Sequence, residues 1–212
     1  MTKNVSHKPR IFHYNDLAIE LHPEVYEPAE DSFLLLDSLS VDPQDTLLEI
    51  GTGCGLIALA YARRGIQVLC TDINPFAVEL VQRNILRNQQ VLKGKIEVRQ
   101  GDLFSALKKD ENFTIIIFNP PYLPTTEKQK TGKWFDIATD GGHDGLRITR
   151  RFLQGVSLHL TAGGSAYFVF SSLSDRLVVE RIFEKQKLTA NIIARRFFED
   201  EELDIYHVFP TA

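Results

Sequence analysis

The chain has 212 residues, of which 43% are hydrophobic, and its formal net charge at pH 7 is −4. That length supports one substantial hydrophobic core and is short for two independent domains. The acidic balance, with a pI near 5.9, gives no general attraction for a polyphosphate backbone, so nucleic acid is a disfavoured partner. No run approaches the roughly 20 apolar residues of a membrane helix, and Cys54 and Cys70 form no Cys-x-x-Cys pair or histidine cluster. We therefore expect a cytoplasmic protein without an internal metal site.

Short apolar runs alternate with longer amphipathic stretches along most of the chain, which is typical of an α/β fold. An N-terminal extension over residues 1–24 precedes a lead-in helix predicted at residues 29–39. The strands predicted after it are residues 46–50, 67–71, 95–99, 113–118, 165–170, 191–197 and 203–209. The helices predicted between them are residues 55–64, 75–88, 103–108, 144–159 and 175–187.

The order of these elements predicts how the strands run. Repeated strand–helix alternation indicates a parallel sheet with right-handed crossovers. The connection between the last two predicted strands is too short for a parallel crossover, so one of them is expected to run antiparallel. The sequence therefore predicts a single domain over residues 25–212, with a seven-stranded, mostly parallel sheet and helices on both faces.

A glycine-rich turn follows the first predicted strand, where LLEIGTGCGL (residues 47–56) places Gly51, Gly53 and Gly55 before a helix. Glycines there allow a tight turn and a close approach of a ligand to the backbone. The loop alone is a weak signal, because dinucleotide enzymes and purely structural turns also use it. Glu49 sharpens the interpretation, since a carboxylate beside the loop suits a ligand with a cationic amino acid head and offers nothing to a pyrophosphate. This favours S-adenosylmethionine over NAD.

Two more acidic residues follow the next two predicted strands. Asp72 lies about twenty residues after the first glycine, where a carboxylate can accept the hydroxyls of an unphosphorylated ribose. Asp102, in GDLF, lies where an adenine amino group could donate to it. Each could instead be a helix cap, and Glu49 a buried structural hydrogen bonder. Acidic residues at three successive strand ends together indicate a nucleoside-type cofactor.

The fourth predicted strand ends in the tetrapeptide Asn119-Pro120-Pro121-Tyr122. The prolines restrict the backbone, so the Asn119 side chain and the carbonyl groups are expected to be held rigidly. The Asn119 side-chain oxygen and the Pro120 carbonyl oxygen can accept both hydrogens of a planar NH2 group, and Tyr122 can stack on that group. In isolation, a structural strand-to-loop turn would explain the motif equally well. At the end of the fourth strand of this strand–helix alternation, the tetrapeptide indicates methyl transfer to an amide or amino nitrogen.

Together these motifs resemble class I methyltransferases of the HemK/PrmC type, the protein-glutamine N5-methyltransferases that modify the Gly-Gly-Gln tripeptide of class 1 translation release factors. The resemblance covers Val25 to the C-terminus and rests on VYEPAEDSFLLLDSL, LEIGTGCGLIAL, TDINPFAV, GDLF, FNPPYLP and DGGHDGL. The chain is most similar to the small eukaryotic and archaeal members, because it lacks the N-terminal helical domain of the bacterial ones. The resemblance implies a Rossmann-like fold.

The resemblance also implies roles for individual residues. The residues expected to contact S-adenosylmethionine are Ser32, Glu49, Gly51, Gly53, Asp72, Asp102, Leu103 and Asn119. Those expected to hold the glutamine are Asn119, Pro120 and Tyr122. Small members of the family pair with a zinc-binding activator subunit that covers an exposed sheet edge, so a similar partner is implied here. In the strand order of such folds, residues 95–100 would form that edge, where another chain's strand can dock.

Residues 123–143 form a polar segment that is too long for a plain connector, and we expect it to be a substrate loop that moves over the acceptor. Trp134 and Phe135 within it would either contact the substrate or anchor the loop against the core. The basic residues in this segment and just after it are expected to be solvent-exposed: Lys128, Lys130, Lys133, His143, Arg147, Arg150 and Arg151.

Other functions remain open at this point. A methyltransferase acting on the exocyclic amine of adenine in DNA or RNA would present the same planar NH2 group to Asn119, although a duplex would require base flipping. A scaffold that binds S-adenosylmethionine without turnover is a second alternative, against which the intact tetrapeptide argues. Lysine methylation fits poorly, because an alkyl ammonium must first lose a proton.

Overall fold

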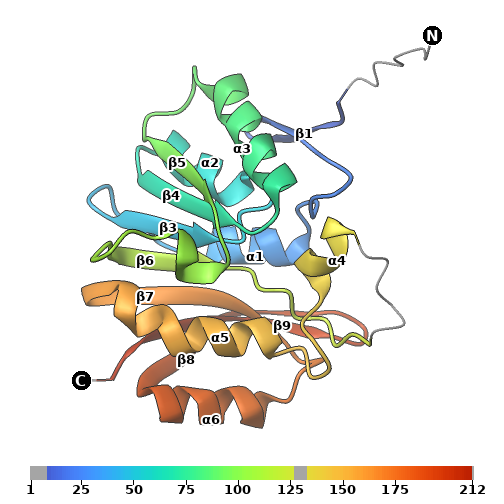
Figure 1. Ribbon diagram of the computed structural model, residues 1–212, viewed down its shortest axis with the longest axis vertical. Helices are drawn as coiled ribbons and strands as arrows, with labels where there is room; N and C mark the ends of the chain where they lie inside the picture. The colour runs from blue at the N-terminus through green and yellow to red at the C-terminus, as the bar shows by residue number, and fades with distance from the viewer. Residues whose placement is uncertain (1–8, 127–132, 212) are drawn as a thin grey trace.

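The centre of the structure is a seven-stranded sheet with the strand order β5-β4-β3-β6-β7-β9-β8 (Figure 1). The computed structural model describes residues 9–126 and 133–211. The strands of the sheet are β3 (Thr46–Ile50), β4 (Gln67–Asp72), β5 (Ile96–Gln100), β6 (Phe113–Phe118), β7 (Leu160–Ser171), β8 (Leu188–Phe197) and β9 (Glu202–Pro210). Neighbours from β5 to β7 pair in parallel, whereas β9 is antiparallel to both β7 and β8. The predicted antiparallel strand and the edge position of residues 95–100 are confirmed.

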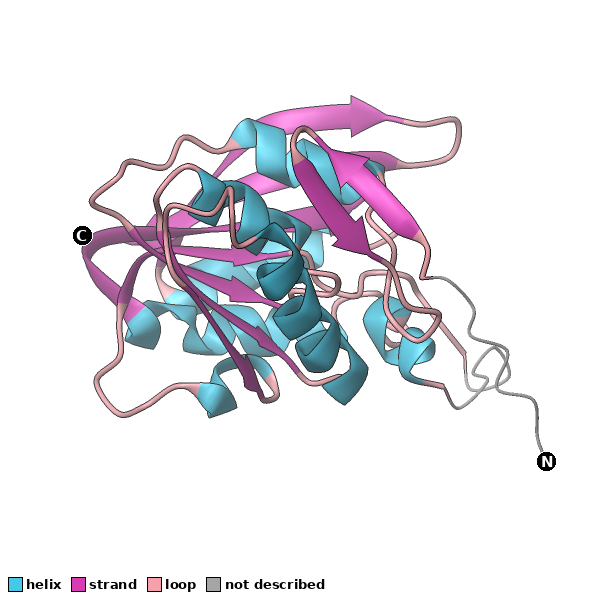
Figure 2. Ribbon diagram, turned by 90° about the horizontal axis from the view of Figure 1, so that it is seen from above, coloured by secondary structure: helices cyan, strands magenta, loops and turns pink. Residues whose placement is uncertain are grey.

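Helices cover both faces of the sheet, as Figure 2 shows from above. The cluster on one face contains residues of α1 (Glu30–Ser38), α2 (Leu56–Arg63) and α3 (Pro75–Asn88). The cluster on the other face contains residues of α5 (Arg147–Gly155) and α6 (Arg176–Gln186). Successive residues of a strand point to opposite faces, and Ile115 accordingly packs in the first cluster and Ile116 in the second. Burial on both faces explains why β6 is almost wholly apolar.

Some element boundaries differ from the prediction. The helix predicted at residues 144–159 begins at Arg147, because Gly145 has a φ of 71° in the preceding turn, and it ends in a 3-10 turn, η3 (Val156–His159). The helix predicted at residues 103–108 is likewise a single 3-10 turn, η1 (Leu103–Ala106). β7 begins five residues before the predicted start, and its register with β6 shifts between Phe113 and Ile115.

The N-terminal extension contains a hairpin that the sequence did not predict. Its strands are β1 (Ile11–Tyr14) and β2 (Leu17–Glu20), which pair antiparallel. Leu17 and Ile19 are fully buried in the cluster that also holds α2 and α3. Strands of four residues carry too little alternation to be recognised locally. Only contact with the helices makes this segment part of the core.

Two asparagines on α3 hold the free edge of β2 in place. The Asn88 side chain accepts from Ala18 N at 2.8 Å and donates to Ala18 O at 3.0 Å. Asn84 accepts from Glu20 N at 2.8 Å and donates to Glu20 O at 3.1 Å, and it also donates to Cys54 O in the glycine loop at 2.9 Å. Residues four apart share a helix face, so the two amides replace a neighbouring strand. The chain that leaves β2 toward α1 is thereby tied to the glycine loop.

None of the helices within the described ranges combines the length and the apolar character that crossing a membrane requires.

Candidate active site

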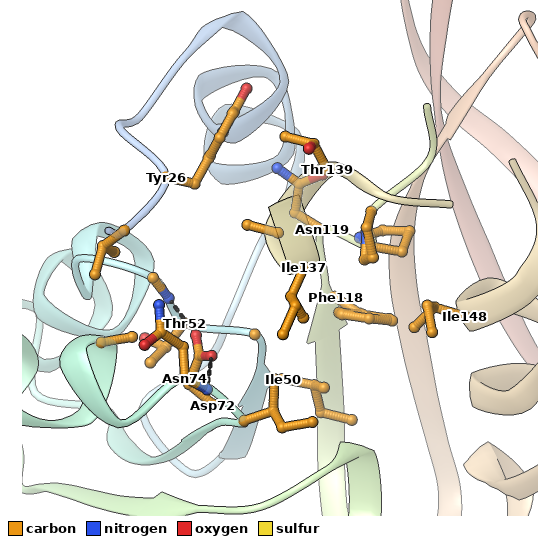
Figure 3. A pocket seen from close by; sticks show the side chains of 18 of the residues that line it. Tyr26, Ile50, Thr52, Asp72, Asn74, Phe118, Asn119, Ile137, Thr139 and Ile148 are labelled. Atoms are coloured by element: carbon orange, nitrogen blue, oxygen red, sulfur yellow. Dashed lines mark hydrogen bonds between the residues drawn. The ribbon is translucent and has the colours of Figure 1, made fainter. Parts of the chain in front are cut away.

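A cavity of about 410 Å³ opens where β3, β4 and β6 end (Figure 3). The carboxyl ends of these adjacent parallel strands meet at one edge of the sheet, where open α/β folds bind ligands. The structure brings every predicted site residue to this cavity: Ser32, Glu49, Gly51, Gly53, Asp72, Asp102, Leu103, Asn119, Pro120 and Tyr122. In Figure 3, Tyr26 and Asn119 lie at one end and Asp72 and Asn74 at the other. We call these the acceptor end and the cofactor end.

The glycine loop forms a wall of the cofactor end. Gly51 and Gly53 have φ values of 65° and 56°, in the left-handed region that favours glycine. A Cβ atom at Gly51 would lie 3.2 Å from the Phe118 ring, so a larger residue would crowd the end of β6 and require the ring to shift. The Gly53 amide donates to Asp72 at 2.9 Å, which fixes the loop against the end of β4. The loop thus leaves a cradle that a ligand can enter.

Glu49 is buried at the end of β3, where its Oε2 accepts from Thr52 Oγ1 at 2.8 Å and from Ala58 N at 3.0 Å. Burial raises the pKa of this carboxyl to about 8, although both hydrogen bonds oppose the shift, and the negative charge of Asp72 adds to it. A cationic group next to Glu49 would reverse this effect by favouring the ionised form. The residue therefore fits the head group of an amino acid ligand.

Asp72 is buried at the end of β4 and accepts from backbone amides on both oxygens. Asn74 N lies 2.9 Å from Oδ1, and Gly53 N lies 2.9 Å from Oδ2. Burial raises the pKa of Asp72 against the opposing effect of these amides. The cap of α3 is Asn74, which accepts from Phe76 N, so the alternative interpretation of Asp72 as the helix cap is wrong. Each carboxylate oxygen keeps a lone pair that can accept a hydroxyl of a bound ligand.

Asp102 follows β5 and is only half-buried. Arg151 of α5 donates to both its oxygens, at 3.3 and 2.8 Å, and the side chains of Arg151 and Asp102 are 48% and 43% exposed, respectively. Arg151 is exposed, as expected, but it also lines the cavity, which the sequence did not predict. Leu103 has a φ of 51°, uncommon for a branched residue, and is buried against the cavity. Together with Ile148, it provides an apolar surface suited to a flat ring.

The acceptor end is organised around Asp31, a residue that was not selected from the sequence. Its Oδ2 accepts from Asn119 Nδ2 at 2.9 Å, from Tyr122 Oη at 3.0 Å and from Tyr26 Oη at 3.2 Å. Burial, together with the neighbouring Asp31 carboxylate, raises the pKa of both tyrosines, so both hydroxyls remain protonated donors. The signal in the sequence was an acidic residue in the first turn of a helix, which the helix dipole alone explains.

These contacts determine how the Asn119 amide is oriented. A carboxylate only accepts hydrogen bonds, so the NH2 side of the amide must face Asp31. Its oxygen, Oδ1, is buried and has no hydrogen-bond partner among the described residues. A buried acceptor without a donor is costly unless a ligand supplies one. The acceptor end therefore contains an unpaired hydrogen-bond acceptor, Asn119 Oδ1, which can accept from an N–H or O–H group of a ligand in the cavity.

A short helix, α4 (Trp134–Thr139), forms another wall of the cavity. Its first backbone amide donates to Glu24 Oε2 at 3.1 Å, which ties it to the chain before α1. Trp134 lines the cavity, whereas Phe135 packs its ring 6.4 Å from that of Tyr26. Residues 127–132 of the predicted substrate loop, which include Lys128 and Lys130, lie outside the described residues.

The chain is similar to known methyltransferases. A family model described as the methyltransferase small domain matches residues 26–194. A putative protein N5-glutamine methyltransferase of Methanocaldococcus jannaschii is 41% identical over 165 residues, which are 77% of this chain and 81% of that protein. The human methyltransferase HEMK2 is 30% identical over 192 residues, which are 86% of this chain and 88% of that protein.

Among solved structures, the chain is similar to one from the E. cuniculi Mtq2–Trm112 complex, which is described as responsible for methylating the translation termination factor eRF1. The TM-score is 0.69 with 22% identity, and the alignment covers 89% of this chain and 99% of that one. At this level of identity the likeness concerns the fold, which is that of class I Rossmann-like methyltransferases.

Proposed function

Because this chain belongs to the methyltransferase small-domain family and is of the HemK/PrmC type, we propose that it methylates the side-chain amide nitrogen (N5) of a glutamine in a protein. The glutamine is that of the Gly-Gly-Gln motif in a class 1 translation release factor. The observation that carries the proposal is the Asn119 amide, whose NH2 group is held by Asp31 and whose buried oxygen has no hydrogen-bond partner among the described residues.

S-adenosylmethionine is the methyl donor, and the residues of the cofactor end suit its parts. Glu49 would face the amino acid head group, Asp72 the ribose hydroxyls, and Asp102 with Leu103 the adenine. The cofactor would supply an electrophilic methyl group: as the acceptor nitrogen formed its bond to that carbon, the carbon–sulfur bond would break to leave S-adenosylhomocysteine, and the nitrogen would then lose a proton to solvent. Ser32 lies beside Asp31 at the acceptor end, where its amide and hydroxyl both donate to that carboxylate, and it lines the cavity.

The acceptor end suits an amide nitrogen because such a nitrogen needs positioning more than it needs a base. Its lone pair is delocalised into the carbonyl group, and holding both N–H bonds aims the nitrogen at the methyl carbon. Asn119 Oδ1 and the Pro120 carbonyl oxygen are the two acceptors for these hydrogens. The ring of Tyr122 lines the same cavity and offers a surface for the planar amide.

A small zinc-binding activator subunit would bind at the β5 edge. This proposal is supported by the similarity to a chain of the two-protein Mtq2–Trm112 complex, and by a difference in strand pairing between the two edges of the sheet. β5 pairs with β4 in an unbroken register, so its free edge can accept another strand. The opposite edge strand, β8, has a register shift between Ile192 and Ala194, which interrupts its pairing pattern. A release factor as substrate is consistent with a protein that works in the cytoplasm.

The proposal is tested by incubating the full chain with labelled S-adenosylmethionine and a purified class 1 release factor, with and without the candidate activator, and mapping the label by peptide mass spectrometry. Label on the glutamine of Gly-Gly-Gln, absent when that residue is changed to alanine, is the expected result. Label on single-stranded or duplex DNA or on RNA in parallel reactions, with none on the release factor, would favour the adenine alternative. Cofactor binding without any transfer, with the activator present, would favour the scaffold.

A further inference from the structure

Asp31 joins three parts of the chain that are distant in sequence. Its partners Asn119 and Tyr122 lie 88 and 91 residues away, and Tyr26 precedes it by five. The carboxylate is 3% exposed, and all three donors converge on one oxygen. A buried carboxylate requires such partners, so these contacts alone would be consistent with a purely structural role.

The second oxygen of Asp31 is engaged as well. Oδ1 accepts from Ser32 N at 2.6 Å and from Ser32 Oγ at 3.2 Å. Both oxygens are therefore surrounded by donors, and neither is left to face an amide oxygen. If Asn119 turned its amide around, two acceptors would meet at hydrogen-bond distance. The environment of Asp31 thus permits a single orientation of the Asn119 side chain.

We propose that Asp31 is a positioning residue that orients the Asn119 amide with its oxygen toward the acceptor, and thereby makes the site selective for an acceptor that donates a hydrogen bond. The two ends of an amide have nearly the same shape, so packing alone distinguishes them poorly. With the amide reversed, its NH2 group would oppose the NH2 group of the acceptor, and two donors would face each other. This inference rests on the proposed function, because it assumes that Asn119 receives an amide hydrogen.

The first test is Asp31→Asn, which keeps the size of the side chain and replaces one carboxylate oxygen with a donor. The new amide can donate to Asn119 Oδ1 and so stabilise the reversed orientation. We expect kcat for the release factor to fall ~100-fold, as misplaced groups in active sites typically produce. The Kd for S-adenosylmethionine should change less than about twofold, since the new amide can keep its oxygen toward Ser32 and no other cofactor residue contacts Asp31 except Asn119. The matched control is Asp37→Asn, an exposed aspartate on the same helix, which should leave kcat and Kd unchanged.

The second test exchanges the two groups in the variant Asp31→Asn/Asn119→Asp. The asparagine at position 31 can keep its oxygen toward Ser32 and donate to one oxygen of the new carboxylate, whose other oxygen again faces the acceptor. We expect this double variant to recover at least ~10-fold of the kcat lost in Asp31→Asn, because the pairing of donors and acceptors is restored.

A third measurement does not depend on the substrate. The side-chain NH2 resonances of Asn119, assigned by their loss in Asn119→Asp, should include a proton shifted downfield in the wild type, and this shift should disappear in Asp31→Asn. Unchanged resonances would overturn the inference even if no release factor were methylated, which would separate its failure from that of the proposed function. Wild-type kcat in Asp31→Asn, or no recovery in a double variant that still folds and binds cofactor, would also overturn it.

Discussion

The two ends of the cavity are built in different ways. At the cofactor end, the two buried acidic side chains are held by groups no more than 19 residues away: Glu49 by Thr52 and Ala58, and Asp72 by Asn74 and Gly53. At the acceptor end, the contacts to Asp31 from the end of β6 span 88 residues or more. Local motifs thus shape the half that binds a common cofactor, whereas tertiary contacts assemble the half that selects the substrate.

This difference predicts which measured quantity each substitution affects. Changes at the cofactor end should alter the affinity for S-adenosylmethionine, whereas changes at the acceptor end should alter turnover with affinity preserved. Substitutions at the two ends test that division.

Asn119→Ala should have the largest effect, because it removes the acceptor for the glutamine N–H and leaves Asp31 without one of its donors. We expect kcat to fall ~10³-fold, comparable to the loss of a hydrogen-bonding group that acts in a transition state. The Kd for S-adenosylmethionine, measured by calorimetry, should stay within about threefold of wild type. Asn112→Ala, at an exposed position before the same strand, is the control. Normal turnover in Asn119→Ala would contradict its role in holding the acceptor.

Asp72→Asn should act on the cofactor instead. The new amide cannot accept on both sides, so the Gly53 amide or a ribose hydroxyl loses its partner. We expect the Kd for S-adenosylmethionine to rise ~10- to 100-fold, since buried hydrogen bonds to charged groups contribute about 1.5–3 kcal/mol. Saturating cofactor should restore most of kcat. Asp200→Asn, in an exposed turn, controls for the change of charge. Unchanged affinity by calorimetry would exclude Asp72 from the ribose site.

Glu49 should make cofactor binding dependent on pH. Its carboxyl has a pKa of about 8 in the free protein, and a nearby ammonium group should lower it, so binding near pH 7 should release a proton. Affinity should therefore rise as the pH increases, by at most ~10-fold per pH unit, and level off above about pH 8. The number of protons released on binding can be measured by calorimetry in buffers of different ionisation enthalpy. Glu49→Gln should abolish both the release and the pH dependence, and their persistence would contradict this role.

The raised pKa of Glu49 also affects the stability of the protein without cofactor. Between the ordinary glutamate pKa of 4.5 and the raised value of about 8, the folded state holds a proton at Glu49 that the unfolded state has lost. The contribution of this group to the free energy of unfolding therefore falls as the pH rises through that window. Thermal denaturation of Glu49→Gln without cofactor should show a weaker pH dependence than the wild type across the same range.

Arg151→Ala should have the smallest effect. The pair with Asp102 is about half exposed, and such ion pairs contribute at most about 1 kcal/mol. Because Arg151 orients the Asp102 carboxylate, we expect the Kd for S-adenosylmethionine to rise less than ~5-fold and kcat to be unaffected. Arg181→Ala, at an exposed position on α6, is the control. A large loss of kcat instead would place Arg151 among the groups that act on the acceptor.

Much of the fold could be predicted from the sequence because its signals are local. The strands at residues 46–50 and 113–118 have the predicted boundaries, since a run of apolar residues ending at a glycine or proline turn identifies a buried strand wherever it packs. The acidic residues Glu49, Asp72 and Asp102 were found by their position after successive strands, and parallel strands bring such positions to one edge.

The remaining features depend on contacts between segments that are distant in sequence. The hairpin of β1 and β2 is too short to be recognised alone and depends on the side chains of Asn84 and Asn88. The orientation of Asn119 depends on Asp31, whose position in a first helical turn already had a sufficient local explanation. Sequence periodicity reports which residues share one face of an element, but it contains no information about which distant segments meet. The residues that line both ends of the cavity could therefore be predicted from the chain, whereas Asp31 and the orientation it gives Asn119 required the folded molecule.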